Sequence, residues 1–123
     1  MLSETVQAWL DKANEDEIVV GLLVANDGPR AIAAYHVQQA AEKLVKAVLV
    51  SKLQAPPKSH DLLQLLNLSG LTISPELEEA AAMTSVFAWI TRYPGSPDVR
   101  QEQLDEVRAH LAIIKAWALH EIG

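Results

Sequence analysis

Two short polar segments carry side chains suited to chemistry on a phosphate group. Arg92 is followed by Tyr93, and His60 is followed by Asp61. Arginine presents a planar fork of donors that matches phosphate oxygens, a tyrosine ring can stack on a base, and histidine can carry protons as a general acid or base. A structural interpretation is also open. His60 would then bond a backbone carbonyl or a neighbouring helix, and Arg92 the last carbonyls of its own helix or an acid of the first helix.

A third polar segment, Gln38-Gln39-Ala40-Ala41-Glu42-Lys43, lies within a stretch of helix-forming residues. Gln39 and Lys43 are four residues apart, as are Glu42 and Lys46, so each pair shares one side of a helix. One interpretation is ordinary surface pairing, which contributes about a few tenths of a kcal/mol. The other is a polar network between helices.

The charged residues are unevenly distributed along the chain. Residues 1–27 contain six acids and one base, whereas residues 28–60 contain one acid and five bases, which are Arg30, Lys43, Lys46, Lys52 and Lys58. The basic segment either faces the acidic first helix or forms a local site for phosphate or an acidic partner. The net charge of −6 argues against a protein that neutralises nucleic acid in bulk.

Several classes of chemistry lack their residues. The chain has no cysteine, which excludes disulfides, thiol catalysis and cysteine-based metal centres. Its four histidines form neither an HExxH motif nor a pair four residues apart, and no glycine-rich phosphate loop or GxSxG motif is present. We therefore expect no metal and no cofactor. No basic, apolar leader and no apolar run of about 20 residues is present, so we expect a cytoplasmic protein without a membrane partner.

The elements that must position these residues are helices. Half of the 123 residues are hydrophobic, which allows one domain over residues 1–123 with a substantial core. Proline and glycine clusters divide the chain into helices at about residues 3–25, 28–53, 59–70, 74–91 and 96–122. The sequence therefore predicts an all-α fold, an up-and-down bundle of about five helices, the first two of them long.

Polarity patterns and start signals refine this bundle. Ser59, Ser74 and Ser96 are the expected starts of the last three helices, the latter two each followed by proline. In the second helix, Gln38, Glu42 and Lys46 lie on the predicted polar side, while Asp16 and Glu17 of the first helix are expected to reach solvent or meet a base. The last helix repeats apolar residues every three or four positions: Leu104, Val107, Leu111, Ile114 and Ala118. Apolar residues left over elsewhere favour dimerisation: Leu49, Val50, Trp89 and Trp117.

Taken in order, these segments resemble a known family. The stretch from Tyr35 to Leu49 resembles the signature of the HEPN domain family (higher eukaryote and prokaryote nucleotide-binding). Ser59-His60-Asp61-Leu62 and Thr91-Arg92-Tyr93-Pro94 follow in that family's order and spacing, and Ala13-Asn14-Glu15-Asp16 is similar to its more variable opening. The matching positions are Gln39, Glu42, Lys43, His60, Asp61, Arg92 and Tyr93.

The resemblance implies a helical bundle that forms a homodimer and is often encoded beside a minimal nucleotidyltransferase, as in toxin–antitoxin pairs. Many HEPN proteins are metal-independent ribonucleases with an Arg-x4–6-His motif late in the chain. No late arginine of this sequence has a histidine at that spacing. Arg30 and His36 have it, but they lie at or before the glutamine-rich signature.

The resemblance therefore predicts a dimeric HEPN-domain protein that pairs with a nucleotidyltransferase and binds a nucleotide or RNA phosphate. The residues expected to bind the ligand are Lys43, Lys46, Gln39 and Arg92. A metal-independent ribonuclease toxin is the first alternative, with Arg92 as the cation and Tyr93 or His60 as the proton carrier. A purely structural helical dimerisation module is the second.

Overall fold

Helices make up the regular structure of the computed structural model, which describes residues 3–89 and 94–123. The elements are α1 (Glu4–Ala25), α2 (Arg30–Ser51), α3 (Leu62–Leu68), α4 (Pro75–Ser85), the short 3-10 turn η1 (Val86–Ala88) and α5 (Gln101–Ile122). The predicted all-α fold with five helices is confirmed. The prediction of two long helices is wrong, because α5 has 22 residues, as many as α1 and α2. Within these two ranges, no helix combines the length and the apolarity needed to cross a membrane.

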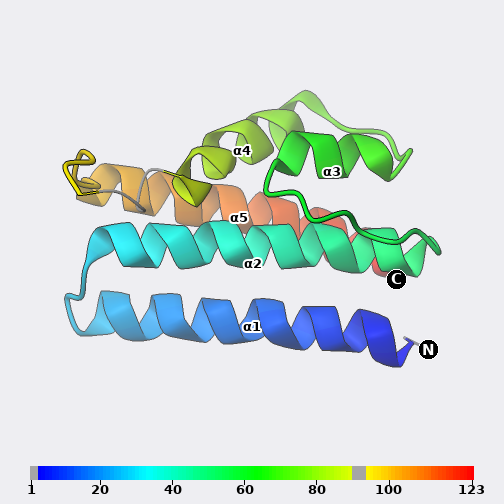
Figure 1. Cartoon of the computed structure of the whole chain (residues 1–123), viewed down its shortest axis with the longest axis horizontal. Helices are drawn as coiled ribbons and strands as arrows, with labels where there is room; N and C mark the ends of the chain where they lie inside the picture. Colours follow the sequence, from blue (N-terminus) through cyan, green and yellow to red (C-terminus); the bar gives the residue numbers. More distant parts are fainter. Residues whose placement is uncertain (1–2, 90–93) are drawn as a thin grey trace.

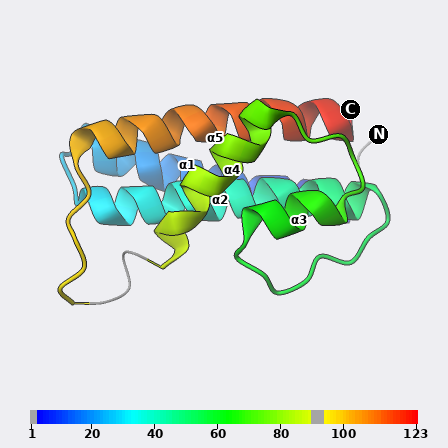
Figure 2. The ribbon, with the colours of Figure 1, turned by 90° about the horizontal axis from the view of Figure 1, so that it is seen from above.

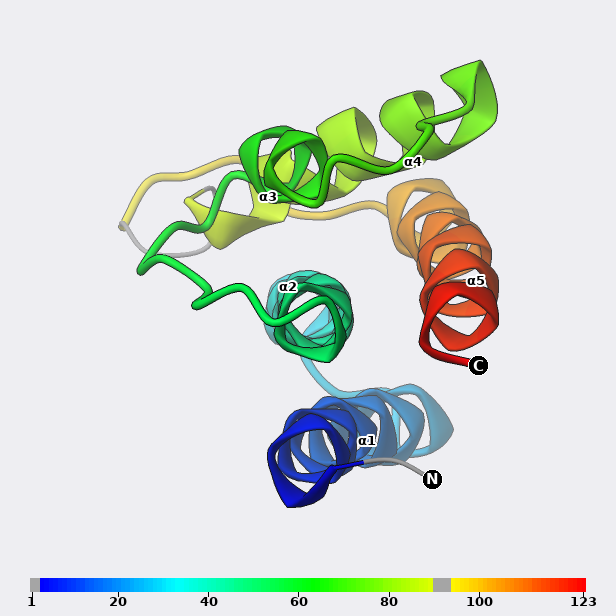
Figure 3. The same ribbon diagram turned by 90° about the vertical axis from the view of Figure 1, so that its right-hand side faces the viewer.

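Helix α2 is the centre of the bundle. It contacts all the other elements, whereas α1 packs mainly against α2 and reaches α5 through an ion pair. Viewed along its axis in Figure 3, α2 is surrounded by α1 on one side, α5 on a second and the α3–α4 pair on a third. Thirteen of its 22 residues are buried, because neighbours cover it on three sides.

The helices alternate in direction except at one connection. In Figures 1 and 2, α1 and α2 run antiparallel, and so do α3 and α4, and α4 and α5. Helices α2 and α3 run in the same direction, because residues 52–61 lead back alongside α2 before α3 begins. This return segment carries His60 to the side of α2.

The helix starts follow local hydrogen bonding. The Ser74 hydroxyl accepts from the backbone N–H of Leu77 at 3.1 Å, and Pro75 is the first helical residue, as predicted. The predicted cap Ser59 is wrong for α3. Asp61 is the cap, since its carboxylate accepts from the N–H groups of Leu63 and Gln64 at 3.1 and 3.3 Å. Aspartate is as good a cap as serine, and it lies directly before the helix.

The predicted start of the last helix at Ser96 is also wrong, because α5 begins at Gln101. Val99 is buried, with only 2% of its surface exposed, and its carbonyl accepts a hydrogen bond from Arg30 Nε at 2.6 Å. The Val99 side chain and carbonyl thus hold residues 96–100 against the bundle in a non-helical conformation, and α5 begins only after them. The backbone N–H of Arg100 then donates to Gln103 Oε1 at 2.9 Å, which caps the new start.

The residues of α4, η1 and α5 that were predicted to face the core are buried. All five seam residues of α5 are buried, and so are the predicted apolar residues of α4 and η1: Leu77, Ala80, Ala81, Thr84, Phe87 and Ala88. Leu49 was predicted to be left over for a dimer contact, but it is buried in the core, with 1% exposed. Trp89 is 55% exposed.

Candidate functional site

A row of three polar side chains lies buried on α2. Gln38 is fully buried, and Glu42 and Lys46 are 5% and 7% exposed. They lie on the predicted polar side of α2, but the interpretation of Glu42 and Lys46 as an ordinary surface pair is wrong. Residue polarity indicates which side of a helix is polar, but it does not reveal that neighbouring elements cover that side as well.

Glu42 is the centre of a hydrogen-bonded network. Its Oε2 lies 3.0 Å from Lys46 Nζ and its Oε1 lies 2.8 Å from His60 Nδ1. The amide Nε2 of Gln38 donates to Glu42 Oε1 and to the carbonyl of His60, both at 3.3 Å, and Gln39 Nε2 donates to Gln38 Oε1 at 2.7 Å. The segment does form a polar network, but its Glu42 part joins α2 to the return segment and not to another helix. The network supplies the partners that a buried carboxylate requires.

The network fixes the orientation of His60. A carboxylate only accepts hydrogen bonds, so with Glu42 ionised Nδ1 is the donor and Nε2 is the ring nitrogen left for another partner. The His60 side chain is 39% exposed, whereas that of Glu42 is 7% exposed. His60 also meets the ring of Trp89 edge to face, with 5.9 Å between centroids. An oriented, accessible imidazole beside an indole ring is the result.

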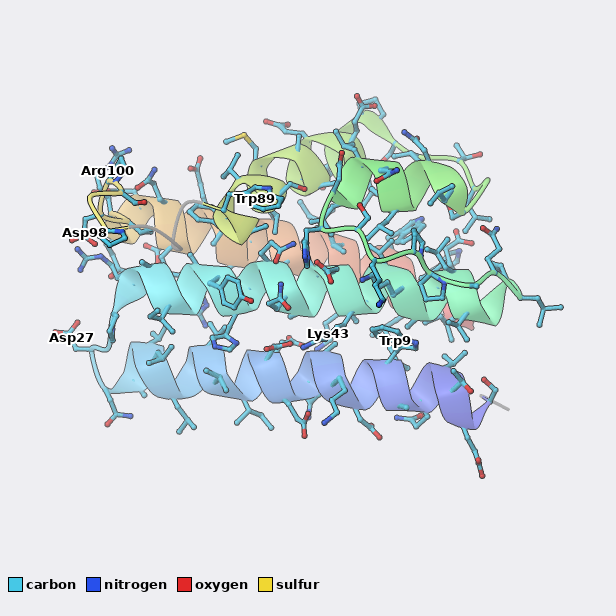
Figure 4. All side chains as sticks on the ribbon, in the orientation of Figure 1. Trp9, Asp27, Lys43, Trp89, Asp98 and Arg100 are labelled. Carbon is cyan, nitrogen blue, oxygen red and sulfur yellow. The ribbon has the colours of Figure 1, made fainter. Side chains whose placement is uncertain are left out.

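A groove of about 720 Å³ opens beside this imidazole. Its lining comes from the return segment, the first turn of α3 and the end of α4 with η1: Pro57, Lys58, Ser59, His60, Asp61, Gln64, Ser85, Val86 and Trp89. Figure 4 places Trp89 on the α4 side of α2, and Trp9 and Lys43 on the α1 side. The groove thus combines a cation, hydroxyl groups, an imidazole and an aromatic surface.

A second acid–histidine–lysine cluster lies between α1 and α2. Asp16 is 7% exposed, and its carboxylate lies 2.8 Å from His36 Nδ1 and 2.5 Å from Lys43 Nζ. Glu17 pairs with Lys115 of α5 at 3.1 Å. The expectation that these two acids reach solvent or meet bases is confirmed, since both meet bases of neighbouring helices.

These contacts separate the bases of residues 28–60 into two groups. Four of them bond within the protein: Arg30 to the Val99 carbonyl, Lys43 to Asp16, Lys46 to Glu42, and Lys52 to the Glu121 carbonyl. Lys46 Nζ also lies 5.8 Å from the centre of the Trp9 ring. Within the described part of the chain, Lys58 is the base of this segment that has no protein partner, and it is exposed in the groove.

The predicted site residues fall in three places. His60 lies in the groove, while Lys43, Lys46 and Gln39 hold internal networks, so their part in ligand binding stays a prediction. Arg92 and Tyr93 lie outside the described residues. The sequence analysis named Lys58 only as one base of the basic segment, and it missed Ser85 and Trp89 as groove residues. The available signals were the position of Lys58 two residues before His60, and an aromatic residue outside the apolar side of its helix.

The described residues contain no set of side chains placed to bind a metal ion. In residues 3–89 and 94–123, no group of three or more histidine, aspartate or glutamate side chains is arranged to hold an ion.

The chain is similar to two solved structures over almost its full length. It matches TT1696 from Thermus thermophilus with a TM-score of 0.85 and 22% identity, covering 97% of this chain and 99% of that one. It matches ST0689, an archaeal HEPN homologue, with a TM-score of 0.79 and 22% identity, covering 96% and 98%. At this identity, the two likenesses establish the fold.

The sequence itself supplies the family. No curated protein is matched by this sequence. The family profile described as HEPN domain matches residues 6–122, which include the buried network on α2 and the groove beside His60. The chain belongs to the HEPN domain family.

Proposed function

We propose that this protein binds a nucleotide, free or within RNA, in the groove beside His60. The chain belongs to the HEPN domain family, whose name stands for higher eukaryote and prokaryote nucleotide-binding. The observation that carries the proposal is the His60 imidazole, which is held at Nδ1 by buried Glu42 and lies in the same groove as Lys58 and Trp89.

The base and the phosphate of a nucleotide each have a suitable contact in the groove. Trp89 offers an indole face or edge for a base. Lys58 offers an unpaired ammonium group for a phosphate, and the Ser85 hydroxyl, whose oxygen accepts from the Leu62 N–H at 3.1 Å, retains its proton as a donor. Asp61 also lines the groove, but its carboxylate caps α3, so its charge is partly satisfied by backbone N–H groups.

The test is a binding titration with AMP, ATP and a short single-stranded RNA. We expect Lys58→Met and Trp89→Ala each to weaken binding by about tenfold, which is within the range for losing a phosphate contact or one stacked base. Lys12→Met is the matched control, because Lys12 is an exposed lysine of α1, far from the groove in the chain. Equal affinities for Lys58→Met and Lys12→Met would reject the groove as the site.

Arg92 extends this proposal. It follows Trp89 by three residues in the sequence, and the family resemblance assigns it to the site. We expect Arg92→Ala to weaken binding at least as strongly as Lys58→Met, since a guanidinium group can hold a phosphate with two hydrogen bonds. An unchanged affinity together with an unchanged melting temperature would remove Arg92 from the site.

A metal-independent ribonuclease is the second candidate, and the Glu42–His60 pair favours it. A carboxylate that orients an imidazole leaves the other ring nitrogen ready for proton transfer. On this candidate, the protein cleaves RNA in EDTA, and His60→Ala, Arg92→Ala or Tyr93→Phe abolishes cleavage. Growth arrest on expression of the protein alone should disappear with Arg92→Ala. Intact RNA at high protein concentration would reject the enzyme while leaving nucleotide binding in place.

Two associations complete the proposal. We expect a homodimer, supported by Ile18 and Leu22, which lie one turn apart on α1 and are 53% and 60% exposed. We also expect pairing with a minimal nucleotidyltransferase encoded beside this chain. Light scattering after size-exclusion chromatography measures both, first with the protein alone and then with the two proteins mixed. Replacing Ile18 and Leu22 by glutamate should give a monomer.

A further inference from the structure

Three large apolar side chains form an exposed stripe at the end of α4. Met83, Val86 and Trp89 are 48%, 50% and 55% exposed, and they follow one another at intervals of three residues. The 3-10 turn η1 explains the alignment, because three residues per turn bring Val86 and Trp89 onto one side. The opposite side of α4 and η1 packs into the core.

The stripe has a small depression beside it. Met83, Val86 and Phe87 line this depression together with Glu106 and Val107 of α5, and its volume is about 90 Å³. This depression is lined by apolar side chains and by the polar side chains of Gln103, Glu106 and His110, and it could hold one side chain of a partner. Large exposed apolar side chains in a contiguous group commonly mark such contact surfaces.

The surroundings of the Met83 end of the stripe are acidic. Glu76 and Glu79 precede Met83 by seven and four residues, so they share its side of α4, and Glu106 lies at the depression. None of these three acids forms an ion pair within the described ranges, and the sequence has no lysine or arginine between Ser74 and Trp89. Among the described residues, the Met83 end of the stripe therefore combines exposed apolar groups with unpaired acids, whereas Lys58 lines the groove at the Val86 and Trp89 end.

The negative charge of these glutamates indicates which kind of partner can bind the stripe. A second copy that set its own Glu79 and Glu106 against these acids would place like charges together, which is unfavourable. We propose that the Met83–Val86–Trp89 stripe binds an amphipathic helix of a different protein, with apolar side chains at three- and four-residue spacing and flanking lysines or arginines. Those basic residues pair with Glu79 and Glu106 while the apolar side chains cover the stripe.

The bound helix also controls the groove, and this part of the inference depends on the proposed nucleotide binding. Val86 and Trp89 belong both to the stripe and to the lining of the groove beside His60. A helix that covers them narrows access to that groove. Nucleotide and helix therefore weaken each other's binding by the same factor, as linkage requires.

Met83 provides a specific reporter for the test. The sequence contains two methionines, Met1 and Met83, so a protein labelled with ¹³C at the methionine methyl groups gives one signal from the stripe. The probe is a synthetic helical peptide of leucine and lysine with an apolar side. A scrambled peptide of the same composition and a leucine–glutamate peptide are its controls. We expect the amphipathic lysine peptide alone to shift the Met83 signal to saturation.

Two double charge-reversal variants distinguish peptide binding at this surface from nonspecific attraction to an acidic protein. Glu79→Lys combined with Glu106→Lys should weaken peptide binding about tenfold. Glu4→Lys combined with Glu15→Lys on α1 changes the net charge equally and should leave binding within twofold. All four glutamates are exposed, so both variants are expected to fold. Equal losses in the two variants, or equal shifts with the scrambled peptide, would overturn the proposal.

Two further outcomes are decisive. A Met83 signal that shifts with protein concentration alone, without peptide, would assign the stripe to a second copy and overturn the proposal. Saturating peptide should lower the affinity for the single-stranded RNA about tenfold, and an unchanged RNA affinity would overturn the control of the groove. If no nucleotide or RNA binds, the proposed function fails, whereas a saturable Met83 shift with the lysine peptide still supports the docking surface.

Discussion

Glu42→Gln removes one charge from a buried ion pair while preserving the shape of the side chain. The Glu42 and Lys46 side chains are 7% and 9% exposed, and their charged atoms lie 3.0 Å apart. Without the carboxylate, the Lys46 ammonium group stays buried beside a neutral amide. Breaking a buried pair from one side costs about 3–5 kcal/mol, because the remaining charge has lost its hydration and its partner.

The chain contains an exposed pair that serves as the reference. Lys12 and Glu15 on α1 lie 3.1 Å apart, but their side chains are 66% and 62% exposed. Solvent screens such a pair, so Glu15→Gln should change the free energy of unfolding by about 0.5 kcal/mol or less. Similar distances with different burial thus predict effects that differ by about sixfold or more.

Urea unfolding followed by circular dichroism at 222 nm measures the free energy of unfolding of both variants, and thermal unfolding gives their melting temperatures. With about 4 °C per kcal/mol for a chain of this size, Glu42→Gln should lower the melting temperature by more than 10 °C. A double mutant with Lys46→Met should recover part of the loss, because it removes the orphaned charge as well. Two results would refute the argument that burial makes this ion pair important for stability. One is an equal loss of stability in Glu42→Gln and Glu15→Gln, and the other is a double mutant whose loss equals the sum of the losses of its two single mutants.

Three other changes test individual features. Asp61→Ala should destabilise the protein by about 1 kcal/mol through loss of the α3 cap, whereas Ser59→Ala should cost less, as measured by urea unfolding. Asp16→Asn should cost about 1–3 kcal/mol in the same assay, less than Glu42→Gln because its two partners are about a quarter exposed and can regain water. Leu53 has φ +61° and is 97% exposed, so Leu53→Gly should raise the melting temperature by a few degrees, by removing left-handed strain at the end of α2.

Local signals in the sequence were sufficient for much of the fold. The seam of α5 from Leu104 to Ala118 repeats every three or four residues, and all of its members are buried because such spacing places them on one side of a helix. Ser74 with Pro75 gave the start of α4 for a similarly local reason. At Ser96 and Pro97 the same signal failed, because the burial of Val99 and its bond to Arg30 depend on residues nearly 70 positions away.

The site required information that no local pattern contains. Glu42 and His60 are 18 residues apart, and their contact depends on the return segment that runs alongside α2. The four-residue spacing of Glu42 and Lys46 correctly predicted an ion pair, but not that α2 is surrounded. Burial turns that pair from a minor surface contact into the structure that orients the imidazole. Trp89 became a groove residue only when η1 brought it next to His60.

One comparison shows whether the lysines of α2 and of the groove stabilise the fold or bind the ligand. Lys43 bonds Asp16 and Lys46 bonds Glu42, whereas Lys58 is exposed in the groove. If Lys43 and Lys46 serve the fold, Lys43→Met should lower the melting temperature and leave RNA affinity within twofold. Lys58→Met should do the opposite, with an unchanged melting temperature and about tenfold weaker binding.

The salt dependence of binding gives an independent readout of the same assignment. Each lysine that contacts a phosphate of single-stranded RNA contributes about 0.7 to the slope of log affinity against log salt concentration. Lys58→Met should therefore reduce that slope by about 0.7, and Lys43→Met should leave it unchanged. A reduced slope for Lys43→Met would mean that the Asp16 pair opens when RNA binds. The basic segment would then serve the ligand directly, as the family resemblance predicts, and the groove around Lys58 would be one part of a larger surface.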